Sequence, residues 1–223
     1  LWDNRRRQNR DLKVLIVARD GQTGTGKSTL AVALAKSWDT EGWDASKATL
    51  DGEEYIDRYT DLNPGEILLG DELEGMADSR RAMSSQNLSL TQYWMTMRQW
   101  EVSTITTMPS ADVVDARLRN LADLYIVVTQ RGEANVYETK IDDTSGERRL
   151  KKLHRVKWDA MDDDPDYQQL AQMKRDHMEN FSERAYHVQS DSDDDRPDPD
   201  DAKRDYRRQV IEQMADDGWT QQE

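Results

Sequence analysis

The sequence predicts an α/β fold with a mostly parallel sheet flanked by helices and followed by a flexible, acidic C-terminal tail. Along residues 1–160, short apolar segments typical of buried strands alternate with segments of helical periodicity. A glycine-rich loop joins the first of these strands to the first helix. After residue 160 the chain becomes strongly acidic, which indicates a segment too polar to form a packed core.

Strand and helix patterns alternate along residues 11–160 and predict one domain there. The apolar run at residues 12–18 is rich in branched side chains and predicts a strand buried on both faces. Residues 28–38 place Leu30, Ala33 and Leu34 on one side of a helix. Further strands are expected at 48–50, 66–70, 103–107, 124–129, 134–141 and 152–158, and further helices at 53–59, 90–100 and 112–120.

The composition excludes several classes of protein. The chain has 223 residues and no cysteine, so disulfide scaffolds, zinc-thiolate sites and thiol nucleophiles are excluded. No apolar run approaches the roughly 20 residues that span a bilayer, so we expect no membrane span.

The charge is unevenly distributed. The net charge is -14, but residues 161–223 hold 19 acidic and 8 basic side chains, so residues 1–160 carry only -3 and can still present a basic patch to phosphate. Asp outnumbers Glu by 31 to 14 and Arg outnumbers Lys by 21 to 10. This bias resembles proteins of salt-loving archaea and their viruses or plasmids, although the acidic tail explains much of it.

The two ends of the chain have their own character. Residues 1–10 form a basic arm, either a phosphate-binding arm or a flexible end. Residues 161–201 are expected to be an acidic linker with a possible helix at 167–183. Residues 202–223 resemble the opening of a helix-turn-helix domain, and Thr220 with Glu223 matches a capping box at the start of a helix. We therefore expect a truncated module that cannot read a major groove as it stands.

Residues 21–28 carry the strongest motif. They match G-x-x-x-x-G-K-[ST] at every defined position and lie between a predicted strand and a predicted helix. In such a loop the backbone N–H groups and the helix N-terminus surround an anion, Lys27 reaches the terminal phosphates and the Ser28 hydroxyl binds magnesium. The predicted nucleotide-binding residues are Gly21, Gln22, Thr23, Gly24, Thr25, Gly26, Lys27, Ser28 and Thr29. The motif resembles the Walker A loop of P-loop NTPases, which implies a P-loop core with ATP and Mg²⁺ as cofactors.

Residues 67–72 resemble the Walker B strand of the same superfamily. The resemblance implies that Asp71 holds magnesium through water and that Glu72 is the general base for the attacking water. The alternative is a carboxylate pair at an ordinary strand-to-loop turn. A glutamate directly after the aspartate is similar to the additional-strand, catalytic-glutamate ATPases, which implies ATP hydrolysis coupled to motion.

Two further features extend the candidate catalytic set. Thr106 or Thr107 on the next strand is the candidate polar sensor, unless these are ordinary polar strand positions. Arg98, Arg117 and Arg119 are candidates for an arginine finger donated across a subunit boundary, or else surface ion-pair partners.

The order of these motifs over residues 11–158 resembles the HerA/FtsK-like DNA translocases, including their viral packaging and Zot-like branches. That resemblance implies a homo-oligomeric ring that acts on double-stranded DNA without sequence specificity, in the cytoplasm or associated with a virion. The loop at residues 76–87, with Arg80 and Arg81, is either a DNA-facing loop or an ordinary solvated one.

The predicted function is therefore an ATP-hydrolysing DNA motor for translocation, genome packaging or plasmid transfer. One alternative is an ATP-switched DNA-binding regulator or a partition or replication ATPase. A small-molecule phosphotransferase is a second alternative, for which Glu72 would be an unusual residue.

Overall fold

The computed structural model describes residues 1–73, 92–95, 97–112, 114 and 116–190. The chain divides into two compact units, Leu1–Arg175 and Asp176–Glu223. The first unit contains all the strands of the described chain and every site residue considered below. Within the described residues, no helix is both long enough and apolar enough to cross a bilayer.

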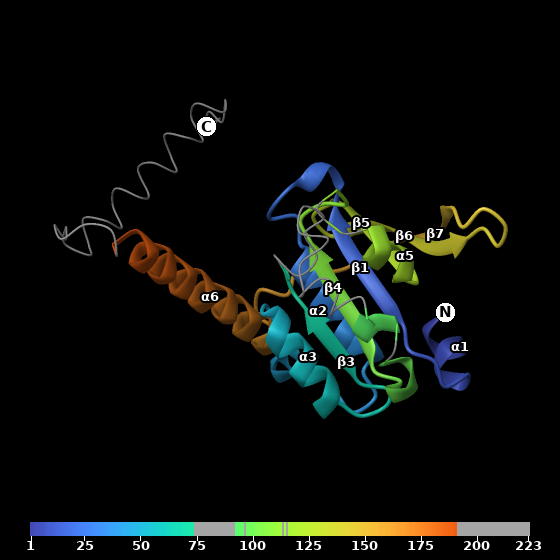
Figure 1. Cartoon of the computed structure of the whole chain (residues 1–223), viewed down its shortest axis with the longest axis horizontal. Coiled ribbons are helices and arrows are strands. Elements are labelled where there is room, and N and C mark those ends of the chain that lie inside the picture. Colours follow the sequence, from blue (N-terminus) through green and yellow to red (C-terminus); the bar gives the residue numbers. More distant parts are fainter. Residues whose placement is uncertain (74–91, 96, 113, 115, 191–223) are drawn as a thin grey trace. The chain divides into compact units, whose positions relative to one another are not determined.

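A seven-stranded sheet forms the centre of the first unit, in the order β2-β3-β4-β1-β5-β6-β7 (Figure 1). The strands are β1 Lys13–Ala18, β2 Ala48–Thr49, β3 Ile67–Gly70, β4 Ser103–Met108, β5 Leu124–Gln130, β6 Glu133–Ile141 and β7 Arg148–Lys157. The first five strands in this order, β2, β3, β4, β1 and β5, run parallel to one another. The last two, β6 and β7, continue the sheet as an antiparallel hairpin. The predicted α/β class with a mostly parallel sheet is therefore confirmed.

Helices cover both faces of the sheet, which explains why the β1 sequence is apolar at nearly every position. Because side chains alternate along a strand, Val14 and Ile16 face the cluster that includes α2, whereas Leu15 and Val17 face the cluster that includes α3 and α5. The helices are α1 Trp2–Arg7, α2 Lys27–Trp38, α3 Gly52–Asp61, α5 Ala116–Leu121 and α6 Pro165–Ser190, with 3₁₀ turns η1 Arg19–Gly21, η2 Ala45–Lys47 and η4 Met97–Trp100.

The N-terminal arm is a docked helix rather than a flexible end. The Trp2 ring stacks on the Trp38 ring of α2 with 6.0 Å between centroids. The Arg5 guanidinium pairs with the Asp123 carboxylate at 2.6 Å. These apolar and charged contacts anchor α1 to the body, so the compact unit includes the residues predicted as a basic arm.

The segment predicted as a linker also begins inside the body. Leu170 on α6 is 1% exposed and packs in the same cluster as α2, together with the half-buried Tyr167 and Met173. The Lys36 ammonium pairs with Asp164 and Asp166 at the start of α6, at 2.6 and 2.7 Å. The first compact unit therefore extends to Arg175, because the apolar side chains at the start of this amphipathic helix are buried on the body.

The other predicted helices and strands differ from the observed ones mainly in where they begin and end. The helix expected at 112–120 is only Ala116–Leu121, and the strand expected from residue 152 begins at Arg148 because it pairs along the full length of β6. In the helix expected at 90–100, residues 92–95 are helical and η4 follows as a 3₁₀ turn. Residues 90, 91 and 96 lie outside the described residues, as do the loop at 76–87 and the segment 202–223.

Candidate nucleotide-binding site

The glycine-rich loop connects the carboxyl end of β1 to the first turn of α2. Gly26 is the residue before the helix and has a φ of 89°, and Gly24 has a φ of 66°. This left-handed conformation is unfavourable for residues with a Cβ atom, so glycine is the appropriate residue at both positions. The local sequence therefore produces the strand, tight loop and helix start that a phosphate-binding loop requires.

Two side chains of the loop are buried without strong partners. The Lys27 side chain, in a residue only 5% exposed, donates to the Gln22 carbonyl oxygen across 3.4 Å. Burial lowers the pKa of Lys27, partly opposed by the charges of Glu72 and Asp71. The Thr25 hydroxyl is buried and makes no hydrogen bond with the described residues. A buried lysine and a buried hydroxyl without strong partners are suited to bind an anion.

Four residues from three elements meet beside this loop. The Ser28 hydroxyl on α2 donates to Asp71 Oδ1 at 3.0 Å, and the Thr107 hydroxyl on β4 donates to the same oxygen at 2.5 Å. Thr107 Oγ1 also accepts the backbone N–H of Glu72 at 3.0 Å. Parallel pairing of β3 with β4 places the ends of these strands side by side.

Thr107, rather than Thr106, lies in the site because of strand alternation. On β4, Ile105 belongs to the α2-side cluster, so Thr107 two positions later faces the same side and Thr106 faces the other. The sequence left these two threonines open, and the choice depends on which face of the sheet α2 covers.

Glu72 has an unusual backbone conformation. Its φ is 51°, a left-handed value that costs a residue with a Cβ atom of order 1–3 kcal/mol. The hydrogen bond from its N–H to Thr107 helps to hold this conformation. The Glu72 side chain remains 39% exposed, so its carboxylate is accessible to solvent at the edge of the site.

Sequence reasoning missed Lys174, which lies on α6. Its ammonium is 2.9 Å from Ser28 Oγ, 2.7 Å from Asp71 Oδ2 and 3.3 Å from Glu72 Oε1. Burial acts to lower the pKa of Lys174, but the charges of Asp71 and Glu72 and their hydrogen bonds outweigh it and raise the pKa. The only signal in the sequence is that Lys174 follows the buried Leu170 by four residues, which places both on one face of α6.

In the part of the chain that the structure describes, the hydrogen bonds given above for the cluster of Ser28, Asp71, Glu72 and Thr107 involve none of the three candidate arginines. Arg98 lies at the opposite, amino end of β1, where it lines a hollow with Arg10, Asp11 and Lys13. Arg119 lies on α5, where its positive charge acts to lower the pKa of Arg148 and the pKa of Tyr125. Arg117 is exposed on the same helix.

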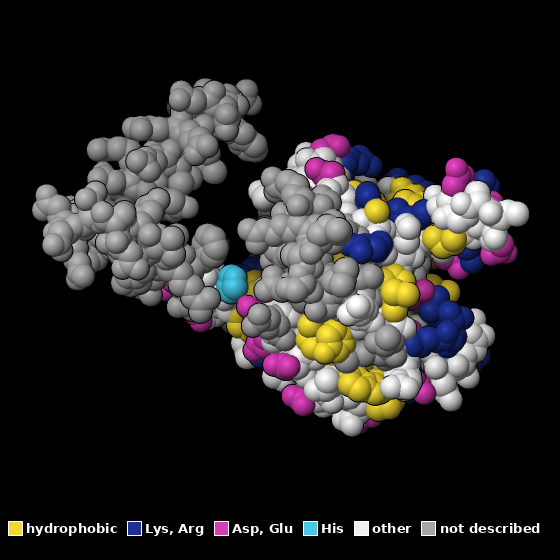
Figure 2. Space-filling model, in the orientation of Figure 1, with side chains coloured by type: hydrophobic (Ala, Val, Ile, Leu, Met, Phe, Trp, Pro, Cys, Tyr) yellow, Lys and Arg dark blue, Asp and Glu magenta, His cyan; other side chains and the backbone are white. Residues whose placement is uncertain are grey.

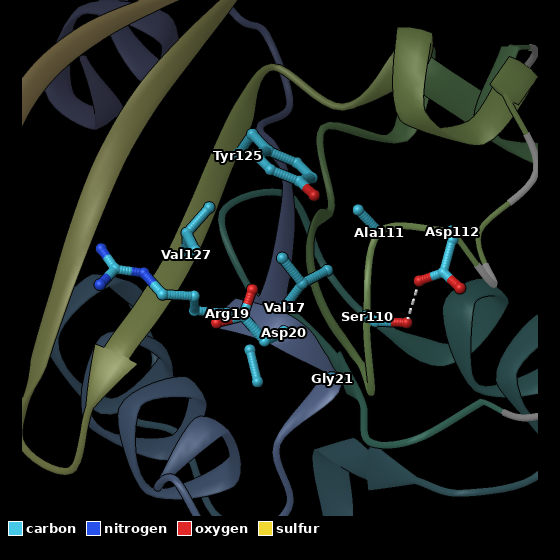
Figure 3. Close-up of a pocket in the computed structure, with 10 residues that line it drawn as sticks. Val17, Arg19, Asp20, Gly21, Ser110, Ala111, Asp112, Tyr125 and Val127 are labelled. Atoms are coloured by element: carbon cyan, nitrogen blue, oxygen red, sulfur yellow. Dashed lines mark hydrogen bonds between the residues drawn. The ribbon is translucent and has the colours of Figure 1, made fainter.

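A separate hollow of about 460 Å³ opens at the carboxyl end of β1 and is lined by Arg19, Asp112 and Tyr125 among others (Figure 3). Gly21 is the only residue of the predicted nucleotide set that lines it. This hollow therefore lies beside the phosphate loop and is distinct from the Ser28 and Asp71 cluster.

The residues present fit a magnesium ion held jointly with phosphates. Magnesium prefers oxygen ligands and is usually bound by one or two protein groups, several waters and the phosphates of a substrate. Ser28 and Asp71 provide a hydroxyl and a carboxylate 3.0 Å apart at the start of α2. Among the described residues, no group of three or more His, Asp or Glu side chains forms an all-protein metal cage.

The fold and the loop together give this chain the arrangement of a P-loop fold: a parallel sheet, a glycine loop after a central strand, and a carboxylate at the end of a nearby strand. No protein-family model matches the chain, and no curated protein matches it.

Solved structures with a similar arrangement include three NTPase or toxin domains. The N-terminal domain of zonular occludens toxin from Neisseria meningitidis has a TM-score of 0.41 and 17% identity, covering 65% of this chain and 95% of that one. The genome packaging NTPase B204 from Sulfolobus turreted icosahedral virus 2, in complex with AMPPCP, has a TM-score of 0.41 and 11% identity, covering 65% and 98%. EssC (ATPases 2 and 3) from Geobacillus thermodenitrificans has a TM-score of 0.37 and 13% identity, covering 81% of this chain and 45% of that one. At these values the similarities establish no activity, so function is inferred from the residues of this chain.

Proposed function

We propose that this chain is an ATPase that uses ATP·Mg²⁺ hydrolysis to move DNA. The observation that carries the hydrolytic part is the convergence of Ser28, Asp71, Glu72 and Thr107 beside the glycine loop. In this proposal the loop N–H groups and Lys27 bind the phosphates, and Ser28 and Asp71 hold the metal. Bound magnesium would neutralise charge that develops on the phosphate oxygens.

Glu72 is the proposed general base. Its partly exposed carboxylate is adjacent to the Asp71 cluster and can accept a proton from a water aligned with the terminal phosphate. Thr107 is a positioning residue in this scheme, because it binds the Asp71 carboxylate and the Glu72 backbone at once. It thereby fixes the metal-binding group relative to the base.

A basic edge strand supports DNA as the partner. β7 carries six Lys or Arg residues and His154 among its ten residues, with no acidic residue. Arg155 and Lys157 are 3.3 and 4.0 Å from Glu133, but Lys151 and Lys152 are exposed and have no ion pair with any described residue. On the face shown in Figure 2, Lys and Arg side chains gather over α1 and beside the β5 to β7 end of the sheet. Such a surface suits the phosphate backbone of DNA, which is read without sequence specificity.

Replacing Lys151 and Lys152 by alanine is expected to weaken binding of duplex DNA and to reduce the slope of log affinity against log salt by about 2, since each phosphate that a lysine neutralises adds about 0.9 to that slope. Fluorescence anisotropy of a labelled duplex over a salt series measures both quantities. The matched double variant Arg6→Ala with Arg7→Ala tests the basic helix α1 instead. An unchanged slope in the β7 variant would mean that these lysines only protect an exposed sheet edge from pairing.

The proposed ring is tested by mixing inactive variants. If Arg98, Arg117 or Arg119 acts on a neighbour's nucleotide, its alanine variant should regain ATPase activity when mixed with a Glu72→Gln chain, because one subunit supplies the arginine and the other an intact pocket. The measurement is phosphate release from each variant alone and from the mixture. No recovery for any of the three arginines would remove the basis for a finger in trans.

The coupling to motion has its own test. Hydrolysis that duplex DNA stimulates, accompanied by displacement of a bound strand or roadblock, supports the motor. Slow turnover with ATP-dependent DNA binding would instead support the ATP-switched regulator or partition ATPase.

A further inference from the structure

Lys174 is held in the site by the packing of its helix. Leu170, one turn earlier on α6, is fully buried against the α2-side core, and Met173 packs on the same cluster. The ion pairs of Lys36 with Asp164 and Asp166 anchor the start of the helix. The first turns of α6 are therefore docked on the body, and they place the Lys174 ammonium against the Asp71 cluster.

The oxygens that Lys174 contacts are those assigned above to the metal and the base. Its ammonium lies 2.7 Å from Asp71 Oδ2, 2.9 Å from Ser28 Oγ and 3.3 Å from Glu72 Oε1. Asp71 is completely buried. A buried carboxylate is costly without an opposite charge, and Lys174 provides that charge when the chain is without nucleotide.

We propose that Lys174 is a built-in counter-ion that occupies the metal position in the nucleotide-free chain and is displaced when Mg²⁺ and nucleotide bind. This inference rests on the proposed function, since it requires that the site binds a magnesium nucleotide. An ammonium held against these oxygens competes with a divalent cation for them, because both are attracted to the same lone pairs and the two cations repel each other. Displacement breaks the direct tie between α6 and the Asp71 cluster, so the position of Lys174 depends on the state of the nucleotide site.

The first test measures how much metal the site requires. Lys174→Gln removes the competing charge, so the Mn²⁺ concentration for half-saturation, followed by Mn²⁺ electron paramagnetic resonance with saturating AMPPCP, should fall about tenfold. That factor corresponds to a metal-ready state populated at about one part in ten in the parent chain. Arg175→Gln is the matched control, because Arg175 is the next residue on α6 and bonds only to Gln172 in the described contacts. Lys174→Arg keeps the cation and should keep the higher metal requirement.

The second test uses the unaltered chain and needs no variant to fold. Acetylation of lysines, read by mass spectrometry, should proceed faster at Lys174 once Mg²⁺ and AMPPCP are added, because the ammonium is released. Lys47, paired with Asp39 and Glu66 away from the site, serves as the internal reference.

The outcomes separate this inference from the proposed function. Equal metal requirements in Lys174→Gln and the parent chain, or unchanged labelling of Lys174, would overturn the counter-ion role. A loss of AMPPCP affinity in Lys174→Gln that persists without metal would also overturn it and would make Lys174 a phosphate ligand. A parent chain that binds no AMPPCP at any Mg²⁺ concentration would instead contradict the proposed function itself.

Discussion

Replacing Lys27 by alanine is expected to weaken ATP binding by at least one to two orders of magnitude. Lys27 is buried in the glycine loop, and among the described residues its hydrogen-bond partner is the Gln22 carbonyl, 3.4 Å away. Its ammonium is therefore free to turn toward a phosphate without breaking a strong bond. A hydrogen bond between charged groups is worth about 1.5–3 kcal/mol, so its loss alone weakens binding by about 10- to 100-fold.

Titration with a fluorescent ATP analogue measures this loss directly. Lys140→Ala is the control, since Lys140 is an exposed lysine on β6 that pairs only with Glu138 in the described contacts. Circular dichroism of both variants verifies that the fold is retained. A Lys27→Ala chain that bound the analogue as tightly as the parent would show that the glycine loop is not the phosphate site.

Replacing Glu72 by glutamine is expected to preserve nucleotide binding and to remove turnover. Glutamine has the same size and the same backbone requirements, so the bond from its N–H to Thr107 and the left-handed φ of 51° are retained. The amide cannot accept the proton of the attacking water. Loss of a general base typically lowers a rate by about 10²- to 10⁴-fold.

Single-turnover phosphate release, compared with analogue binding by the same variant, separates chemistry from affinity. Glu41→Gln is the control, because Glu41 is an exposed glutamate between α2 and η2. If Glu72→Gln hydrolysed ATP at the parent rate, another group would have to activate the water.

The elements that the sequence predicted well are those governed by short-range patterns. The apolar run that became β1 is recognisable because a strand buried on both faces contains little else. The glycine loop is recognisable because left-handed backbone positions require glycine at fixed spacing before a helix start. Asp71 and Glu72 follow β3 directly, so their place at the end of a strand could be read from adjacent residues.

The features that the sequence left undecided depend on long-range packing. Thr106 and Thr107 are equivalent as a local pattern, and only the side of the sheet that α2 covers assigns Thr107 to the site. The segment predicted as a basic arm is a docked helix because the Trp2 ring stacks on the Trp38 ring, a contact that no local sequence pattern predicts.

Lys174 illustrates the same limit most clearly. It is 146 positions from Ser28 in sequence and lies in a segment whose composition indicated a solvated linker. By itself the sequence determined the strand, the loop and the carboxylates, because glycine geometry and hydrophobic periodicity act over a few residues. Only the tertiary structure decided which distant side chains complete the site, because burial of Leu170 on the body, rather than any motif, brings the Lys174 ammonium to Asp71.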